Sequence, residues 1–317
     1  MEVTEILADV KQVIQEFRNV HPTGICVIRW ATATGKTKLS LELAKHFVVE
    51  IIGADSRQLF RGMDIGTDKV SQNIRNKIIH HQIDIINPDQ HYTAGQWKQD
   101  TEHIVEKILE QKKIPLIVGG TGLYIDTIYK NFSMPEVLPN YTLRDELMAK
   151  EEKTPGILRE ELATVDPVEA KRHHPKSLRY IIRALEIYHE SGLTKTASFI
   201  EQKPKRPILM IGLWREKEDT NTRINKRIDE MFDEGLIDEV QWLLDQWYSP
   251  TLQSMQGIGY KEVVQYLQWN ITKEECIEQV KITTHQLAKR QRTWFRRYIA
   301  DAEVGRENIV YSNFMLT

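Results

Sequence analysis

The sequence predicts an α/β fold in which a parallel sheet is flanked by helices. Short apolar segments of strand length alternate with helix-length segments through the first half of the chain. These apolar segments are nearly continuous, which is typical of parallel strands buried on both faces. Three of them end in short loops of glycine or polar residues, and a parallel sheet collects such loops at one edge.

The expected strands and helices follow from their composition and from the residues that end them. An acid ends the second apolar segment, and Pro115 stops the helix that precedes the third. Strands are expected at 24–28, 50–55, 116–121 and 207–213, and helices at 39–47 and 94–111. Beyond Arg215 the chain is expected to be helical.

Three regions of the chain differ in residue pattern and composition. Residues 1–20 carry apolar side chains at helical spacing, which predicts an amphipathic helical extension docked on the domain. Those side chains are Ile6, Val10, Val13, Ile14 and Phe17. Between 133 and 204, prolines punctuate charged, helix-favouring segments, which predicts a mainly helical insertion domain. Residues 21–132 and 205–317 then form the α/β core with its C-terminal helices.

Bulk composition excludes several classes of protein. A chain of 317 residues that is 41% hydrophobic can bury a large core, and its net charge of −2 gives no global field for nucleic acid. Two cysteines, Cys26 and Cys276, argue against a disulfide framework and a zinc module. No apolar run approaches the ~20 residues of a membrane span, and residues 1–17 lack a signal-peptide pattern. A cytoplasmic monomer without membrane contact is therefore expected.

The segment 31–37, with the sequence ATATGKT, lies between the first strand and a helix. A phosphate-binding P-loop requires this context, because backbone N–H groups and a helix N-terminus converge there on one anion. Lys36 would add a positive charge, and the Thr37 hydroxyl would reach a Mg²⁺ ion. The motif predicts a P-loop NTPase-like sheet that handles a di- or triphosphate. A helix start without a ligand is the alternative.

Asp55 ends the second strand, whereas the third strand ends in the turn Gly119–Gly122. Kinases and NTPases usually place a second acid at such a strand end, so its absence after Val118 disfavours an ordinary ATP-dependent kinase. Asp55 could hold a metal ion, act as a general base close to the phosphates, or cap a helix. His80 and His81 have no metal-ligand spacing and are expected to be structural.

A basic stripe marks the C-terminal helical region. No acidic residue occurs from 279 to 300, and Lys289, Arg292 and Arg296 share one helical face. Aromatic residues Trp294 and Phe295 are interleaved with them. Such a stripe can follow a phosphate backbone and stack on unpaired bases. The alternative is a solvated helix face with aromatic core residues.

Together these motifs resemble the tRNA dimethylallyltransferases, which attach an isopentenyl group to the exocyclic N6 amine of the adenosine just 3′ of the anticodon. The similarity runs from about residue 27 to residue 297. It is carried by ATATGKT (31–37), ADSRQLFRGMDIGTDK (54–69), HHQID (80–84), PLIVGGTGLYI (115–125), RYIIRALEIYHESG (179–192), RINKRIDEMFDEGLIDEV (223–240), GIGYKE (257–262) and AKRQRTWFRR (288–297).

The resemblance implies a donor site for dimethylallyl diphosphate, with Mg²⁺ at Thr37. Asp55 would accept the proton of the adenine amine, Thr121 would lie near the acceptor, and Arg227 would close on the diphosphate, with Arg223 as its alternative. The implied catalytic residues are Asp55, Thr121, Lys36 and Arg227. The implied donor-binding residues are Ala31, Thr32, Ala33, Thr34, Gly35, Lys36, Thr37, Arg223 and Arg227.

The resemblance also implies that four segments bind the anticodon stem-loop of tRNA, whose target adenosine is flipped into the site. The implied RNA contacts are Asp55, Ser56, Arg57 and Gln58; Arg179, Tyr180, Ile181, Ile182 and Arg183; Gln256, Gly257, Ile258, Gly259, Tyr260 and Lys261; and Lys289, Arg290, Gln291, Arg292, Thr293, Trp294, Phe295 and Arg296.

Four positions depart from the family pattern. The loop begins with Trp30 instead of glycine, Arg57 stands where Met is usual, Phe60 where Tyr is usual, and Gly257 where a small residue such as Ala is usual. Trp30 is expected to narrow the donor tunnel, to alter donor choice or to weaken turnover.

Two other functions stay open. An adenylate isopentenyltransferase, acting on free nucleotides, would use the same loop and Asp55, but the basic helix and Arg179–Arg183 would then have nothing to hold. A tRNA-binding homologue with weakened catalysis could follow from Trp30, although Lys36 and Asp55 are present.

Overall fold

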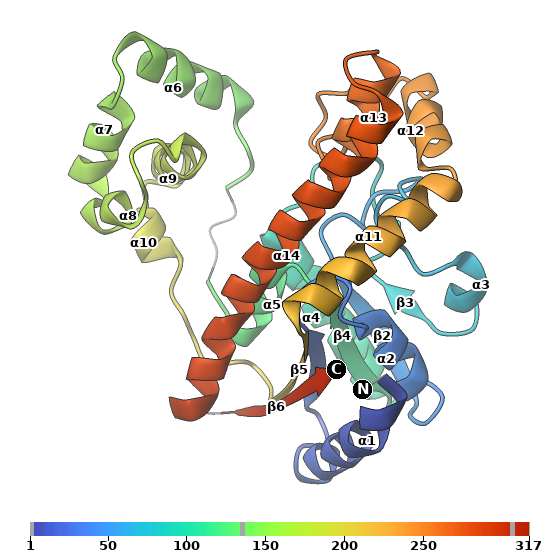
Figure 1. Ribbon diagram of the computed structural model, residues 1–317. Coiled ribbons are helices and arrows are strands. Elements are labelled where there is room, and N and C mark those ends of the chain that lie inside the picture. Colours follow the sequence, from blue (N-terminus) through green and yellow to red (C-terminus); the bar gives the residue numbers. More distant parts are fainter. Residues whose placement is uncertain (1–2, 134–136, 305–307, 317) are drawn as a thin grey trace. The chain divides into compact units, whose positions relative to one another are not determined.

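The computed structural model describes residues 3–133, 137–304 and 308–316. The chain divides into two compact units, one formed by residues 1–129 and 204–317 and the other by residues 130–203 (Figure 1). None of the helices in the described ranges is long and apolar enough to span a bilayer.

The first unit is built on a six-stranded parallel sheet with the strand order β3-β2-β4-β1-β5-β6. Its strands are β1 Ile25–Arg29, β2 Val49–Ala54, β3 His80–His81, β4 Ile114–Gly119, β5 Ile208–Arg215 and β6 Ile309–Leu316. Its helices are α1 Val3–Val20, α2 Lys36–Leu43, α3 Gln72–Arg75, α4 Ala94–Glu110, α5 Gly122–Tyr129, α11 Lys217–Asp233, α12 Leu236–Asp245, α13 Tyr260–Leu267 and α14 Lys273–Val304. The arrangement confirms the predicted fold class.

Successive side chains of the central strands enter two different cores. In β1, Ile25 and Val27 belong to one core, which also contains side chains of α4, α5 and α11–α14. Cys26 and Ile28 point to the other, which contains side chains of α1 and α2. The buried face of α1 consists of Val3, Ile6, Val10, Ile14 and Phe17. The N-terminal segment is therefore an amphipathic helix packed on the sheet, as predicted.

Two strands were not predicted. β6 lies where the chain was expected to be helical, and it pairs with β5 from Ile208↔Ile309 to Arg215↔Leu316. Its β-branched and aromatic side chains suit a pleated surface better than a helix. The short β3 forms the opposite edge, where the ring of His81 lies 2.7 Å from a carboxylate oxygen of Glu50.

Both cysteines of the chain are buried, Cys26 in β1 and Cys276 in α14. Burial raises the pKa of each thiol to about 12. The two side chains act as small apolar core residues.

The second unit is helical in its described residues, apart from one antiparallel bridge between Ser133 and Ile200. Its helices are α6 Tyr141–Lys153, α7 Ile157–Val165, α8 Pro167–Arg172, α9 Leu178–Ser191 and α10 Lys195–Ser198. The fully buried Glu186 accepts hydrogen bonds from Arg144, which fixes α6 against α9.

Candidate functional site

Three loops meet at the carboxyl edge of the sheet. The last residues of three adjacent strands are in register, because Ala54 of β2 pairs with Gly119 of β4 and Gly119 also pairs with Arg29 of β1. The loops that follow these strands, at 30–37, 55–58 and 120–122, therefore start side by side. A Cβ on Gly119 would lie 2.1 Å from the Ala54 carbonyl oxygen, which explains why the β4 strand ends in glycine.

The loop at 31–37 closes tightly over its own backbone. Ala33 and Gly35 adopt positive φ angles of 62° and 96°, and the Thr34 hydroxyl donates to the Ala31 carbonyl. The Lys36 ammonium donates to the same carbonyl at 2.6 Å. Burial lowers the pKa of Lys36 to about 8, although the nearby charge of Asp55 acts in the opposite direction. Lys36 is therefore charged at neutral pH and lies close enough to Asp55 to feel its field.

The Trp30 side chain is buried in the protein core, although the residue stands at the start of the loop at 31–37. Its ring is 5% exposed and stacks on Phe295 of α14, with centroids 6.2 Å apart. The Arg29 guanidinium lies 5.3 Å from the centre of the same ring. The side chain thus fills the core beneath α14, and this packing gives no support to the expectation that it narrows a donor tunnel. The backbone of Trp30 has φ 152°, a conformation that glycine adopts more easily.

We predict that Trp30→Ala destabilises the protein by about 3 kcal/mol, because the large ring leaves a cavity. Trp30→Gly should destabilise the protein by about 1 kcal/mol less than Trp30→Ala, since glycine relieves the strained backbone. Urea unfolding of both variants measures this difference. A Gly variant that is less stable than the Ala variant would show that the positive φ carries no strain.

Asp55 and Thr121 belong to the other two loops of this edge. The Asp55 carboxylate accepts a hydrogen bond from the backbone N–H of Arg57 at 2.9 Å. The Thr121 hydroxyl oxygen accepts one from the N–H of Ser56 at 3.0 Å. No helix begins between 56 and 71, so Asp55 orders a turn and does not cap a helix. Burial, together with the charge of Asp55, raises the pKa of Tyr124 well above its usual value, so Tyr124 stays a neutral neighbour of the site.

Arg227 links the loop at 31–37 to a second loop. It donates to the Thr32 hydroxyl at 2.7 Å and to the Asp68 carboxylate at 2.8 Å. Its Nε is buried without a hydrogen-bond partner among the described residues. Arg223 instead bonds Asp219 on its own helix α11. Of the two arginines, the structure places Arg227 at the loop.

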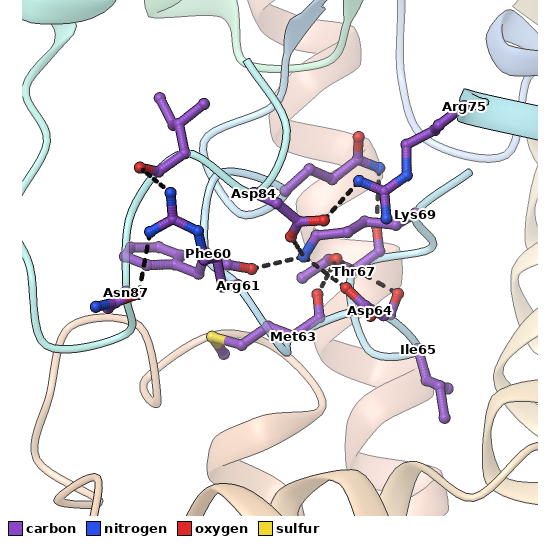
Figure 2. A network of polar contacts seen from close by, with 12 residues as sticks. Phe60, Arg61, Met63, Asp64, Ile65, Thr67, Lys69, Arg75, Asp84 and Asn87 are labelled. Carbon is purple, nitrogen blue, oxygen red and sulfur yellow. Dashed lines mark hydrogen bonds and ion pairs between the residues drawn. The ribbon is translucent and has the colours of Figure 1, made fainter. Parts of the chain in front are cut away.

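The loop that carries Asp68 is fixed by a polar network (Figure 2). The Lys69 ammonium donates to the carboxylates of Asp64 and Asp84 and to the carbonyl of Phe60, and its side chain is 1% exposed. From the other side, the Glu239 carboxylate accepts the N–H groups of residues 64–66. Burial alone would raise the pKa of Asp84, but Lys69 and Arg75 hold that pKa below its usual value.

Replacing Lys69 by methionine is expected to lower the free energy of unfolding by about 2 kcal/mol, because it leaves a partly buried carboxylate with one partner fewer. Asp84 has a lowered pKa in the folded state, so its stabilising contribution exists above its unfolded pKa and is lost as the pH falls through the folded value. The difference between wild type and variant in urea unfolding should therefore shrink in acid. The exposed Lys77→Met is the control, and equal stability of all three proteins at pH 7 would contradict the prediction.

Only part of the basic stripe on α14 is exposed to solvent. Lys289, Arg290 and Arg296 are exposed. Arg292 is half-buried, and its Nη1 has no hydrogen-bond partner among the described residues. A surface of this kind suits phosphate groups, since the exposed positive charges of Lys289, Arg290 and Arg296 are available to them.

Two of the predicted RNA-binding segments lie together in the first unit. Arg57 donates to the carbonyl of Gln253 at 2.8 Å, which ties residues 55–58 to the loop before α13. Arg179 and Tyr180 are exposed on α9 of the second unit, where Tyr180 stacks on His173 with centroids 4.7 Å apart.

Six residues of the predicted RNA-binding set are buried, four of them with side chains in hydrophobic cores and two as glycines in the turn before α13. They are Ile181, Ile182, Gly257, Gly259, Tyr260 and Phe295. Phe295 thus follows the alternative interpretation of the stripe, in which the aromatic residue belongs to the core.

Sequence reasoning missed the contacts that join the loops. Asp68, Lys69 and Glu239 were not singled out, although all three lie inside the stretches 54–69 and 223–240 that carried the resemblance. Gln291 was assigned to RNA, but its amide bonds both the loop at 31–37 and the turn at 120. These partners are far apart in the chain, and no local pattern pairs them.

Comparison with known proteins identifies the family of this chain. The sequence profile described as "IPP transferase" matches residues 58–298. The tRNA dimethylallyltransferase of Pelotomaculum thermopropionicum is 42% identical over 276 residues, which cover 86% of this chain and 88% of that protein. The corresponding protein of Thermotoga maritima is 41% identical, with 86% and 90% covered.

Solved structures give the same result. The tRNA isopentenylpyrophosphate transferase of Bacillus halodurans superposes with a TM-score of 0.65 at 35% identity, covering 92% of this chain and 90% of its own. A eukaryotic dimethylallyltransferase acting on tRNA superposes with a TM-score of 0.73 at 27% identity, covering 92% and 73%. With a profile match over most of its length and relatives of this identity, the chain belongs to the IPP transferase family.

Proposed function

We propose that this protein transfers the dimethylallyl group of dimethylallyl diphosphate to the N6 amine of the adenosine 3′-adjacent to the anticodon in tRNA, releasing diphosphate, and that it works as a cytoplasmic monomer. The observation that supports this most directly is that a positively charged phosphate-type loop and Asp55 follow two strands, β1 and β2, that end at the same edge of the sheet on either side of β4. Lys36 and Asp55 interact electrostatically across this edge. One side suits a leaving diphosphate, and the other suits an amine that must lose a proton.

The chemistry assigns a role to each side. The N6 lone pair forms a bond to C1 of the donor while the bond from C1 to the diphosphate oxygen breaks, and the electron pair leaves with the diphosphate. Lys36 and Arg227 stabilise the charge that develops on that group. Asp55 accepts the proton from N6, which is a weak nucleophile because its lone pair is delocalised into the ring. Thr121, whose hydroxyl oxygen accepts the N–H of Ser56, is assigned to orient the adenosine.

Magnesium is part of the proposal through the donor. The described residues hold no group of three or more acidic, histidine or cysteine side chains suited to a metal. Thr37 is exposed on the first turn of α2, and its hydroxyl is a suitable single ligand. Mg²⁺ is often held by few protein oxygens together with substrate phosphates and water, so these residues fit an ion brought by the diphosphate. When bound, it would neutralise leaving-group charge.

The tRNA is proposed to lie against the exposed basic residues of α14 and against residues 55–58. The target base must leave its stack to reach Asp55, at a cost of a few kcal/mol. The basic face disfavours a free nucleotide as acceptor, because a single nucleotide leaves Lys289, Arg290 and Arg296 without partners.

The deciding experiment incubates the purified protein with dimethylallyl diphosphate, Mg²⁺ and either unmodified tRNA or AMP. Digestion and mass spectrometry then detect isopentenyl adenosine. Product on tRNA alone supports the proposal. Product on AMP alone would reassign the protein to free nucleotides, and tRNA binding without any product would indicate a binding protein or a different donor.

A further inference from the structure

Gln291 of α14 is bonded to both loops of the proposed site. Its Oε1 accepts the backbone N–H of Thr32 at 2.8 Å, in the loop at 31–37. Its Nε2 donates to the carbonyl of Gly120 at 2.9 Å, in the turn that carries Thr121. One side chain thus connects the proposed donor side to the proposed acceptor side.

These two bonds require a neutral amide. Thr32 N–H can only donate and Gly120 C=O can only accept, so the bridging group must accept at one end and donate at the other. A carboxylate of the same length would accept from Thr32 but repel the Gly120 carbonyl. A methionine of similar length would make neither bond.

The glycines of the turn at 119–122 allow α14 to pack closely against it. A Cβ on Gly120 would lie 2.5 Å from Nε2 of Gln291, and a Cβ on Gly122 would lie 2.3 Å from the indole of Trp294. Both glycines therefore permit a close approach of the helix. On the other side, Trp30 stacks on Phe295, so α14 also contacts the start of the loop at 31–37.

From this arrangement we infer that Gln291 is a positioning residue for prenyl transfer, which sets the distance between the diphosphate loop and the turn that holds Thr121. The inference rests on the proposed function. Transfer requires the donor carbon and the acceptor nitrogen to approach in line, and a displacement of about 1 Å can reduce the rate about 100-fold. Because the amide touches protein backbone on both sides, its loss should alter the chemical step more than the binding of either substrate.

The kinetic test compares wild type, Gln291→Met and Gln279→Met, which makes the same change at an exposed position of the same helix. Single-turnover rates are measured with tRNA and dimethylallyl diphosphate saturating and are normalised to tRNA-binding sites. Gln291→Met should react about 100-fold more slowly, with Kd for tRNA and KM for the donor within about threefold of wild type. Gln291→Glu should be at least as slow, because the carboxylate faces a carbonyl. An unchanged rate, or a loss confined to affinity, would overturn the inference.

A second measurement does not depend on catalysis. Amide hydrogen exchange of residues 30–37 and 119–122 should be faster in Gln291→Met than in wild type and Gln279→Met, because Thr32 N–H loses its acceptor. Unchanged exchange in both segments would overturn the inference even if the protein transfers no prenyl group. Failure of the wild type to form product would instead count against the proposed function. If Gln291→Met does not fold, Gln291→Asn, which is too short to reach both partners, replaces it in both measurements.

Discussion

Replacing Asp55 by asparagine is expected to lower kcat for prenyl transfer by about 10³-fold and to leave the affinity for tRNA unchanged. The amide oxygen of asparagine can still accept the N–H of Arg57, a bond that measures 2.9 Å in the native protein, so the turn at 55–58 should persist. What the variant loses is the carboxylate that we propose as the acceptor of the N6 proton. Single-turnover rates with saturating tRNA and donor measure the effect.

The exposed Asp89→Asn provides a control for a lost carboxylate elsewhere on the surface. A kcat for Asp55→Asn within threefold of wild type would remove Asp55 as the base. A loss of tRNA affinity equal to the loss in rate would instead make Asp55 a residue that binds the acceptor.

Lys36→Met should reduce kcat/KM for dimethylallyl diphosphate by about 10³-fold, since it removes the charge that we propose to stabilise the leaving diphosphate. The Lys36 ammonium contacts the Ala31 carbonyl inside the loop, so the effect should concentrate on the donor and spare tRNA binding. The exposed Lys107→Met is the matched control. Wild-type kinetics for the donor in Lys36→Met would place the diphosphate elsewhere.

The same lysine predicts a pH dependence. Burial lowers the pKa of Lys36 to about 8 in the free protein, so the charged form dominates below that value and is lost as the pH rises through it. kcat/KM for the donor should fall above pH 8. A bound diphosphate favours the charged lysine, so kcat at saturating donor should fall at a higher pH than kcat/KM.

The strands at the site were predictable because each is a short apolar run with a distinct ending. The second strand was expected at 50–55 and is observed at Val49–Ala54. β6 was missed because its side chains are mostly half-exposed on an edge strand, and this mixed pattern lacks the continuous apolar run that identified the others. Its position depends on pairing with β5, which is a tertiary contact.

The chemistry of the site was predictable where one short motif carries it. Asp55 directly follows β2, and Lys36 begins the helix after the loop that follows β1, so their meeting at one edge follows from parallel topology. The role of Gln291 was not predictable, since its partner Gly120 is 171 residues away. Nor could the sequence show that the Trp30 ring packs on Phe295, because a residue at a loop start can point to the ligand or to the core.

The two buried cysteines have a practical consequence for following the reaction. Maleimides react with thiolates, and both native thiols are enclosed and have a pKa of about 12, so they should resist labelling in the folded protein. A single cysteine introduced at the exposed Thr293 of α14 would then be the preferred attachment point for a fluorophore. Such a label could report the arrival of tRNA in real time without removal of any native residue from the core.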